Sequence, residues 1–519
     1  MIGPGIGSWP ARRARMDPAA TAMATDDEAL TYAHLAARVE ATADHLRALG
    51  VGAGHRVAYL GPNSIDTFVC FFATARIGGI FVSLNTRLAA PEISYMLADS
   101  GSVVLVHGPE CAELARAADP AAYGVKQVLS APDLRAAVAG GHAPAWPDQL
   151  VDLDDPVLIL YTSGTTGRPK GAVLTHANIT WNTVNQLVHV DVLSTDVALC
   201  AAPLFHVTGL GQVSMPTLLK GGTVVVVPKF DAGGFLGLIG RWHATSFAAV
   251  PTMLQMMCDH PDWETADLSS LRFVIYGGSP IAERVAAAWL ARGVVLQQGY
   301  GMTEAAPGVF MALGDGATSR PVSAGVPHFF TDVDLDRADD GQDQGELLVR
   351  GPNVFAGYWN RPEETALALR DGWFRSGDVV RTDDDGWAYV IDRVKDLIIS
   401  GGENIYPAEV EAAIAELADV HAVAVVAVPD PQWGEVGCAY VVLRQGADLG
   451  ELGLRAHLDQ RLARYKIPRY FELVDELPTN ATGKVLRAVL REQARHAHAS
   501  PDLTPEKTPE KTPEKTESS

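Results

Sequence analysis

The chain has 519 residues and a formal net charge of −21, with 47% hydrophobic and 20% charged residues. This is the composition of a globular protein, and it excludes bulk disorder and fibrous folds. The acidic balance argues against nucleic-acid binding, which needs a basic face to displace counterions from phosphates. Five scattered cysteines form no C-x-x-C pair, which indicates thiols in a reducing compartment. No apolar stretch is long and unbroken enough for a membrane span, so we expect a cytoplasmic protein.

Most of the chain alternates between strand and helix patterns. Thr31 is a plausible cap for a helix that begins at Tyr32. Buried strands are expected at 56–60, 81–82, 103–106, 157–160, 224–227 and 273–276. Such alternation predicts an α/β fold with mostly parallel sheets covered by helices on both faces.

The pattern of expected strands and helices changes after about residue 390. Short helical patterns at 409–417 and 452–462 flank strand patterns at 420–428 and 438–443, which predicts a small α+β domain. We therefore expect an N-terminal domain at 1–392, a C-terminal domain at 393–498 and a tail at 499–519. Within the tail, residues 504–515 repeat Thr-Pro-Glu-Lys three times without an apolar residue, so we expect it to be disordered.

The sharpest motif runs from Tyr161 to Gly171 and directly follows the strand at 157–160. Its backbone N–H groups and hydroxyls can wrap phosphate oxygens, while a lysine adds positive charge. The candidate residues are Thr162, Ser163, Gly164, Thr165, Thr166, Gly167 and Lys170. The spacing differs from the G-x-x-x-x-G-K-[ST] loop, and a solvated turn is the simpler reading of a generic loop of this kind.

A second motif, from Gln298 to Glu304, follows a strand expected at 294–296, and ligands collect at such strand ends in α/β sheets. Thr303 can bind a phosphate oxygen, and Glu304 can hold a hard cation such as Mg²⁺. Taken alone, Glu304 is more simply an acidic residue at a helix N-terminus.

Further polar loops follow along the chain. Gly277, Gly278 and Ser279 end a strand and would let a flat base approach the backbone. Asp378 is expected at a loop end, where its carboxylate suits a ribose diol. The remaining candidates are Arg393 and Lys395 where the pattern changes, Gly401 and Gly402 in a tight turn, and Lys484 at the end of a loop. Each alone is more simply a surface turn or an ion pair, and only their number and order point to a site.

Together these motifs resemble the AMP-forming acyl-CoA synthetases of the adenylate-forming superfamily, over about residues 8–496. The resemblance implies a large N-terminal domain and a small mobile C-terminal domain. It also implies a two-step reaction with ATP, CoA and Mg²⁺. A carboxylic acid first attacks the α-phosphate of ATP, which gives an acyl-adenylate and pyrophosphate, and the CoA thiol then releases AMP.

The resemblance also implies a role for each matched residue. Residues 162–170 correspond to the loop that holds the β- and γ-phosphates, Thr303 to the residue on the α-phosphate and Glu304 to the Mg²⁺ ligand. Lys484 corresponds to the catalytic lysine of the first step and Lys395 to the hinge. The other matches are Gly277, Gly278, Ser279, Gln298, Gly299, Tyr300 and Gly301 at the adenine and acyl sites, Asp378 and Arg393 at the ribose, Gly401 and Gly402 at the pantetheine channel, and His206 beside the acyl pocket.

The acid substrate is less strongly indicated. The pocket-forming strings at 207–210, 276–280 and 305–309 contain no basic residue, which disfavours a dicarboxylate. The motif at 301–307 resembles hydroxycinnamate–CoA ligases, and residues 7–16 resemble bacterial feruloyl-CoA synthetases. The string at 392–409 equally resembles bacterial medium- and long-chain fatty acyl-CoA synthetases. We favour an aromatic acid such as ferulate or coumarate.

Two other functions stay open at this stage: transfer of the acyl-adenylate to a carrier protein or another acceptor, and a non-catalytic nucleotide or acid sensor. The sequence does not reveal the oligomeric state, and a homodimer is among the options.

Overall fold

The computed structural model of the chain describes residues 3–139, 149–162, 169–278, 281–320, 323–337, 343–393, 396–400, 403–430, 433–462, 464–480 and 484–498. The chain divides into two compact units, Met1–Val390 and Ile391–Ser519. The sequence places the boundary between its two domains at residue 392. The repeat tail at 499–519 lies outside the described residues.

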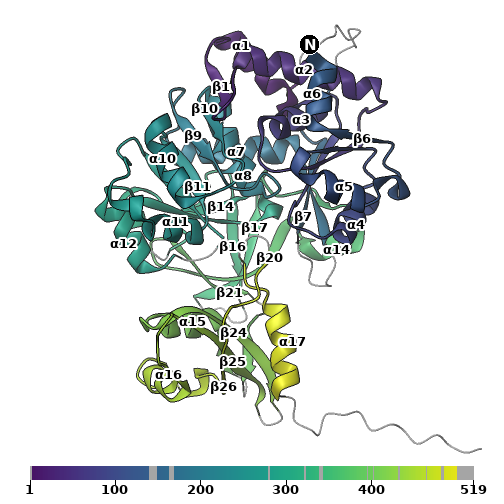
Figure 1. Cartoon of the computed structure of the whole chain (residues 1–519). Coiled ribbons are helices and arrows are strands. Elements are labelled where there is room, and N and C mark those ends of the chain that lie inside the picture. Colours follow the sequence, from purple (N-terminus) through teal and green to yellow (C-terminus); the bar gives the residue numbers. More distant parts are fainter. Residues whose placement is uncertain are drawn as a thin grey trace, which may run out of the picture. The chain divides into compact units, whose positions relative to one another are not determined.

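A nine-stranded sheet within the described residues carries the second motif, in the order β15-β14-β13-β12-β11-β9-β10-β1-β2. Figure 1 labels β14, β11, β9, β10 and β1 of this sheet. Its strands are β1 (Thr21–Ala24), β2 (Ala29–Thr31), β9 (Val197–Cys200), β10 (Thr223–Val226), β11 (Ser246–Ala249), β12 (Phe273–Tyr276), β13 (Leu296–Gly301), β14 (Gly308–Met311) and β15 (Val326–Pro327). The strands from β1 to β13 along this order run parallel, and β2, β14 and β15 are antiparallel at the edges.

Helices cover both faces of this sheet, because side chains along a strand point alternately to opposite faces. On β10, Val225 packs into the core cluster of α10 (Ala232–Trp242), α11 (Pro251–Cys258) and α12 (Glu283–Ala291). Its neighbours Val224 and Val226 pack into the cluster of α7 (His176–His189), α8 (Val207–Gly211) and α9 (Ser214–Lys220).

A second sheet carries the first motif, in the order β18-β8-β7-β4-β3-β5-β6. Its strands are β3 (Arg56–Leu60), β4 (Ile80–Leu84), β5 (Val104–His107), β6 (Gln127–Ser130), β7 (Pro156–Thr162), β8 (Lys170–Thr175) and β18 (Gly357–Tyr358). Strands β3 to β7 run parallel, whereas β8 and β18 are antiparallel. Its helices are α2 (Tyr32–Ala48), α3 (Ile65–Arg76), α4 (Ala90–Ser100), α5 (Ala112–Ala117) and α6 (Ala131–Ala139). The expected helix start is confirmed, since the Thr31 hydroxyl accepts a hydrogen bond from the His34 amide at 3.2 Å.

A third, antiparallel sheet completes the large unit. Its strands are β16 (Asp332–Asp336), β17 (Gln344–Arg350), β20 (Trp373–Thr382) and β19 (Leu369–Arg370), with β21 (Ala388–Arg393) beside β20. The remaining helices of this unit are α1 (Trp9–Met16), α13 (Gly314–Ser319) and α14 (Pro362–Ala368), with short 3₁₀ turns at Ile6–Ser8, Pro109–Cys111, Pro120–Tyr123, Pro261–Glu264 and Thr303–Ala305.

The small unit is an α+β domain with its own core. Its strands are β22 (Ile398–Ser400), β23 (Glu403–Ile405), β24 (Val420–Asp430), β25 (Gly434–Leu443) and β26 (Tyr470–Leu473), and a 3₁₀ turn lies at Arg464–Lys466. Alternate residues of β25 face different helices. Ala439 and Val441 pack in the cluster of α15 (Pro407–Ala415) and α16 (Glu451–Leu458), whereas Cys438 and Tyr440 pack with α17 (Arg487–His498).

The expected fold class is confirmed: sheets flanked by helices form the large unit, and a small α+β unit follows it. Among the helices of the described residues, none has the length and apolar content that crossing a membrane requires.

Candidate active site

The ends of β7 and β8 frame the first motif. Thr162 is the last residue of β7 and lies opposite Lys170, the first residue of β8, across an antiparallel pair. The chain between them therefore leaves and re-enters the sheet at neighbouring positions. Ser163, Gly164, Thr165, Thr166 and Gly167 lie in that interval, outside the described residues.

Lys170 and Glu304 are connected through Tyr358. The Tyr358 hydroxyl donates a 2.9 Å hydrogen bond to Oε1 of Glu304. The Lys170 ammonium lies 5.4 Å from the centre of the Tyr358 ring, within the range of a cation–π contact, and 3.7 Å from the Glu364 carboxylate. One tyrosine thus brings the candidate phosphate lysine and the candidate metal ligand to the same place.

The position of Glu304 is also fixed through its backbone. It lies in the 3₁₀ turn Thr303–Ala305, which follows β13, and its carbonyl accepts a hydrogen bond from the Phe355 amide at 2.8 Å. Burial, and then the nearby Glu304 charge, raise the pKa of Tyr358 above its ordinary value. Tyr358 therefore stays protonated and remains a hydrogen-bond donor to this carboxylate. Thr303 opens the same turn.

Asp378 and Tyr300 form a second contact between predicted site residues. The Tyr300 hydroxyl donates to Oδ2 of Asp378 at 2.5 Å, and the Asp378 side of this contact is buried, with 5% of the residue exposed. Tyr300 comes from β13 and Asp378 from β20, so the contact joins the nine-stranded sheet to the third sheet.

Two placements expected from the sequence are wrong. Gln298 to Gly301 lie within β13 and not in a loop after it, because the strand begins only at Leu296. Asp378 lies within β20 and not at a loop end. The physical reason at Asp378 is a β-bulge: the pairing of β20 with β17 shifts register there, and Gly377 adopts a φ of +72°. The bulge turns the Asp378 side chain toward Tyr300.

Close backbone packing explains the glycines of these motifs. A Cβ on Gly277 would lie 2.5 Å from the Gly299 carbonyl oxygen, and one on Gly301 would lie 1.6 Å from that of Pro307. Gly278 has a φ of +91°, which favours glycine. Ser279 lies outside the described residues. The backbones of three segments therefore pack directly against one another: the end of β12, β13 and residues 305–308.

Helix α7 ties the surrounding loops together through three buried asparagines. Asn178 Nδ2 donates to the carbonyls of Pro352 and Val354, at 2.9 and 2.7 Å. Asn182 accepts from the Gly308 amide and donates to the Gly211 carbonyl, each at 3.0 Å. Asn185 accepts from the Phe330 amide at 2.9 Å and donates to the Thr331 hydroxyl at 3.2 Å. These bonds fix α8 and the segment at 305–308 relative to each other.

His206 immediately precedes α8. Its Nε2 is buried and has no hydrogen-bond partner among the described residues, and its ring centre lies 4.9 Å from that of Phe205. Burial, and then the charge of Arg87, lower its pKa to about 4. The ring is therefore neutral at physiological pH.

The small unit holds the other predicted residues, of which Lys484 is the best described. Asn480 and Lys484 close a turn: the Asn480 amide donates to the Lys484 carbonyl, and the Lys484 amide donates to Oδ1 of Asn480. The side chain of Lys484 is exposed. Arg393 ends β21, and its side chain is outside the described part. Lys395, Gly401 and Gly402 also lie outside the described residues, although Ser400 and Glu403 on either side of the two glycines pair as the ends of a hairpin.

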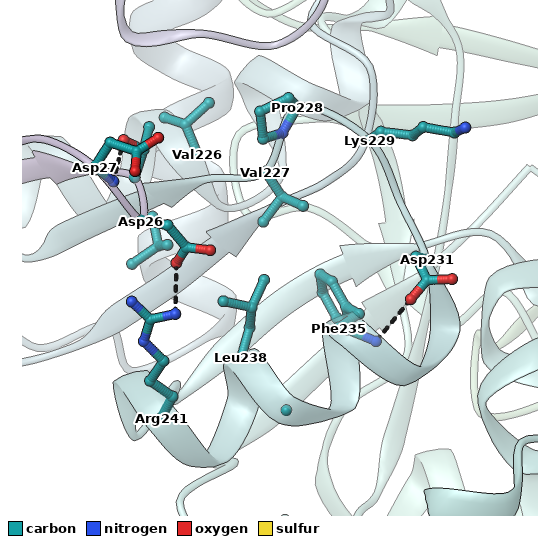
Figure 2. Close-up of a pocket in the computed structure, with 14 residues that line it drawn as sticks. Asp26, Asp27, Val226, Val227, Pro228, Lys229, Asp231, Phe235, Leu238 and Arg241 are labelled. Atoms are coloured by element: carbon teal, nitrogen blue, oxygen red, sulfur yellow. Dashed lines mark hydrogen bonds and ion pairs between the residues drawn. The ribbon is translucent and has the colours of Figure 1, made fainter.

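A separate surface pocket of about 570 Å³ contains none of the predicted site residues (Figure 2). It lies between β10, α10 and the turn after β1. Three of its charged side chains have structural partners: Arg241 pairs with Asp26 at 3.0 Å, and Asp231 caps α10 by accepting from the Gly234 amide at 2.8 Å. Nothing in this arrangement points to chemistry.

Sequence reasoning missed Tyr358 and the asparagines of α7. Tyr358 sits in a string rich in Gly, Asn and Pro, which indicates only a turn, and its partner Glu304 lies 54 residues away. The asparagines did carry a signal, because Asn178, Asn182 and Asn185 recur at helical spacing. Polar residues in that pattern normally mark a solvated face, whereas here all three are buried.

Comparison with protein-family models places both units in one class of enzyme. Residues 10–359 match the model described as AMP-binding enzyme, and residues 409–484 match the AMP-binding enzyme C-terminal domain. The class that the fold and site indicate is thus the adenylate-forming enzymes. The chain belongs to the AMP-binding enzyme family, and the resemblance to AMP-forming acyl-CoA synthetases noted in the sequence is confirmed.

Three similar proteins cover nearly the whole chain. A feruloyl-CoA synthase of Amycolatopsis sp. is 50% identical over 94% of this chain and 99% of its own length. A long-chain-fatty-acid–CoA ligase of Mycobacterium tuberculosis H37Rv is 39% identical over 90% of this chain and 93% of its own length. The solved structure of O-succinylbenzoate coenzyme A synthetase from Bacillus subtilis, in complex with ATP and magnesium ion, superposes with a TM-score of 0.84 at 32% identity, covering 93% of this chain and 98% of that one.

Proposed function

We propose that the chain is an AMP-forming acid–CoA ligase whose substrate is an aromatic acid of the hydroxycinnamate type, such as ferulate or coumarate. ATP adenylates the carboxylate and releases pyrophosphate, and the CoA thiol then displaces AMP. The observation that carries the substrate class is the 50% identity to a feruloyl-CoA synthase over almost the full length of both chains. The small, uncharged strings at 207–210 and 305–309 suit an apolar acid.

The contact of Lys170, Tyr358 and Glu304 supports a role in binding the triphosphate. Both reactants of the first step are anions, so positive groups that offset charge on the transferring phosphate lower the barrier. Thr162, Lys170 and the hydroxyl-rich residues between them would hold the β- and γ-phosphates, and Thr303 the α-phosphate. A carboxylate held by a tyrosine beside this loop fits a hard cation, and Glu304 would hold Mg²⁺, which supplies charge neutralisation.

The buried contact of Tyr300 with Asp378 supports nucleoside binding. An Asp carboxylate can accept hydrogen bonds from both hydroxyls of a ribose. Gly277 packs tightly against β13, and the neighbouring Gly278 is exposed, so no side chain blocks the approach of a flat base to the backbone here. The residues we assign to the base are Gly277, Gly278, Ser279 and 298–301, and Arg393 is assigned to the ribose beside Asp378.

The small unit would supply the groups that distinguish the two steps. Lys484 would stabilise the charge of the first step, and Gly401 and Gly402 would face the pantetheine arm of CoA in the second. Lys395 would be the hinge about which the small unit moves between the two steps, so that one acid pocket serves both. Mobile elements often bring different groups to one site in successive steps. ATP and CoA are cytoplasmic metabolites, and we place the enzyme in the cytoplasm. A homodimer is an assembly that light scattering can test.

A second candidate substrate is a medium- or long-chain fatty acid, which the 39% identical fatty-acid–CoA ligase favours. The test is the formation of AMP and acyl-CoA with ferulate, coumarate, benzoate and fatty acids of several chain lengths. We expect the highest kcat/KM with ferulate or coumarate. A higher kcat/KM with fatty acids would replace the aromatic assignment, and no thioester with any acid would overturn the ligase.

A further inference from the structure

Buried polar atoms without partners gather on one face of α7 and on the loop opposite it. Gln186 is fully buried, and neither atom of its amide has a hydrogen-bond partner among the described residues. His328 is 2% exposed, and neither ring nitrogen has a partner of hydrogen-bond geometry there, nor has Nδ1 of His189. Such atoms are rare in folded proteins, because a buried polar atom without a partner loses its hydrogen bonds to water and gains none in return. The cluster therefore calls for an additional partner.

The two histidines and the glutamine are neighbours. The ring centres of His189 and His328 lie 4.3 Å apart. Gln186 lies three residues before His189 and four after Asn182, so the three share one face of α7. We call Gln186, His189 and His328 the buried polar cluster.

The cluster borders the segments assigned to the acid pocket. A Cβ built on Gly308 would lie 2.6 Å from Nε2 of His328, so only the absence of a side chain at Gly308 leaves room for this imidazole. The Gly308 amide binds Asn182, and the same Asn182 binds the carbonyl of Gly211 in α8. The strings at 207–211 and 305–309 thus meet at Asn182, one helical turn from Gln186.

A further unpartnered atom lies at the same junction. Gln212 directly follows α8, is 7% exposed, and has no hydrogen-bond partner for Oε1 among the described residues. Its Nε2 lies 3.7 Å from the place of a Cβ on Gly299 in β13. The two strings assigned to the acid pocket, at 207–210 and 305–309, are therefore apolar in sequence, but buried amide and imidazole groups lie next to them.

The charge state of the cluster limits what it can bind. Burial, and then the proximity of His189, lower the pKa of His328 to about 3, and burial lowers the pKa of His189. The backbone carbonyls of Asn185, near His328, and of Pro327, near His189, act in the opposite direction but reverse neither shift. Both rings are neutral at physiological pH, and each then carries one donor and one acceptor nitrogen. Such groups suit a neutral hydroxyl and do not suit a second carboxylate.

We infer that His328, supported by His189 and Gln186, is a specificity-determining residue that hydrogen-bonds the ring hydroxyl of a phenolic acid. This inference rests on the proposed function and goes beyond it by naming the groups that distinguish a hydroxylated ring from a bare one. A phenol supplies a donor and an acceptor to the cluster, whereas an alkyl chain or an unsubstituted ring leaves the same buried atoms unpaired. A site built for a substrate hydroxyl rejects analogues that lack it for this reason.

The test compares coumarate with cinnamate, which differ only in the ring hydroxyl. For the unmodified enzyme we expect kcat/KM to be at least about tenfold higher for coumarate, since one hydrogen bond of about 1.4 kcal/mol corresponds to that factor. In His328→Leu we expect coumarate to lose about 10- to 100-fold, cinnamate to change less than about threefold, and the KM for ATP to stay constant. His328→Gln keeps a donor and an acceptor and should retain part of the coumarate preference.

Ser246→Ala is the matched control, because Ser246 in β11 is another fully buried residue whose side-chain oxygen has no partner among the described residues, and it lies at the N-terminal end of its strand. We expect this variant to keep the ratio of the two acids. Equal losses with coumarate and cinnamate in His328→Leu would show a merely structural role and overturn the inference. A ratio near one in the unmodified enzyme would overturn it without any variant, and would indicate that water occupies the cluster. If neither acid is a substrate but fatty acids are, the proposed substrate class itself is wrong.

Discussion

The contact between Tyr358 and Glu304 gives a direct test of the proposed triphosphate site. Tyr358→Phe removes the hydroxyl that donates a 2.9 Å hydrogen bond to Glu304. It keeps the ring, whose centre lies 5.4 Å from the Lys170 ammonium. A hydrogen bond to a charged group contributes about 1.5–3 kcal/mol. At about 1.4 kcal/mol per factor of ten, its loss predicts a KM for Mg·ATP that is about 10- to 100-fold higher.

The assay is pyrophosphate release at saturating acid, with Mg²⁺ and ATP varied independently. We expect the variant to need more Mg²⁺ at every ATP concentration, because the freed carboxylate is less well positioned as a ligand. The KM for the acid should stay the same, since Tyr358 contacts groups assigned to the phosphates.

Tyr389→Phe is the control for this experiment. The Tyr389 hydroxyl also donates to a carboxylate, that of Asp383, at 3.1 Å, and neither residue belongs to the proposed site. We expect a similar small change in melting temperature in both variants. If both variants keep the Mg²⁺ and ATP dependence of the unmodified enzyme, the reasoning about Tyr358 and Glu304 is refuted.

Three other predictions concern the proposed catalytic lysine, the close backbone packing and the buried histidine. Lys484→Ala should abolish adenylate formation but spare thioester formation from supplied acyl-AMP. The control variant Lys126→Ala should keep both half-reactions. Equal loss of the two half-reactions in Lys484→Ala would contradict the assignment. Gly301→Ala should lower the melting temperature by several degrees or prevent soluble expression, because its Cβ would fall 1.6 Å from the Pro307 carbonyl oxygen; an unchanged melting curve would argue against this packing. Because the pKa of His206 is lowered to about 4 in the folded chain, the unfolded chain takes up a proton at this residue at higher pH than the folded chain does. The neutral, buried His206 therefore contributes fully to stability above about pH 6.5, and this contribution is lost as the pH falls to about 4. The loss amounts to about 3 kcal/mol. His206→Phe should therefore show a shallower loss of urea stability between pH 6.5 and 4, and an identical slope would disprove the role of this histidine.

Local sequence signals predicted the elements better than the contacts between them. The strand before the first motif, the cap at Thr31 and the pairing of Ser400 with Glu403 all depend on residues within a few positions of one another. The same local signals placed Lys170 directly after a glycine-rich string, where the structure has the start of β8.

The misplaced residues are those whose position depends on distant partners. Gly299 and Gly301 disfavour a strand by composition, yet both belong to β13. At Gly301 the Pro307 backbone approaches too closely for any side chain, and that approach depends on a residue outside the strand. The bulge that turns Asp378 depends on its pairing with β17, which a sequence pattern does not specify. Tyr358 could not be assigned for the same reason, because its function is defined by Glu304 on another element.

The three asparagines of α7 also have a consequence for how the protein folds. Their partners lie up to 176 residues away in the chain, and each bond joins segments that no local turn could bring together. Contacts of such long sequence separation form late, because the entropy of closing the loops must be lost before the contacts stabilise the chain. The segments of the proposed acid pocket should therefore be among the last parts of the large unit to become protected from hydrogen exchange during refolding, and they should gain protection together.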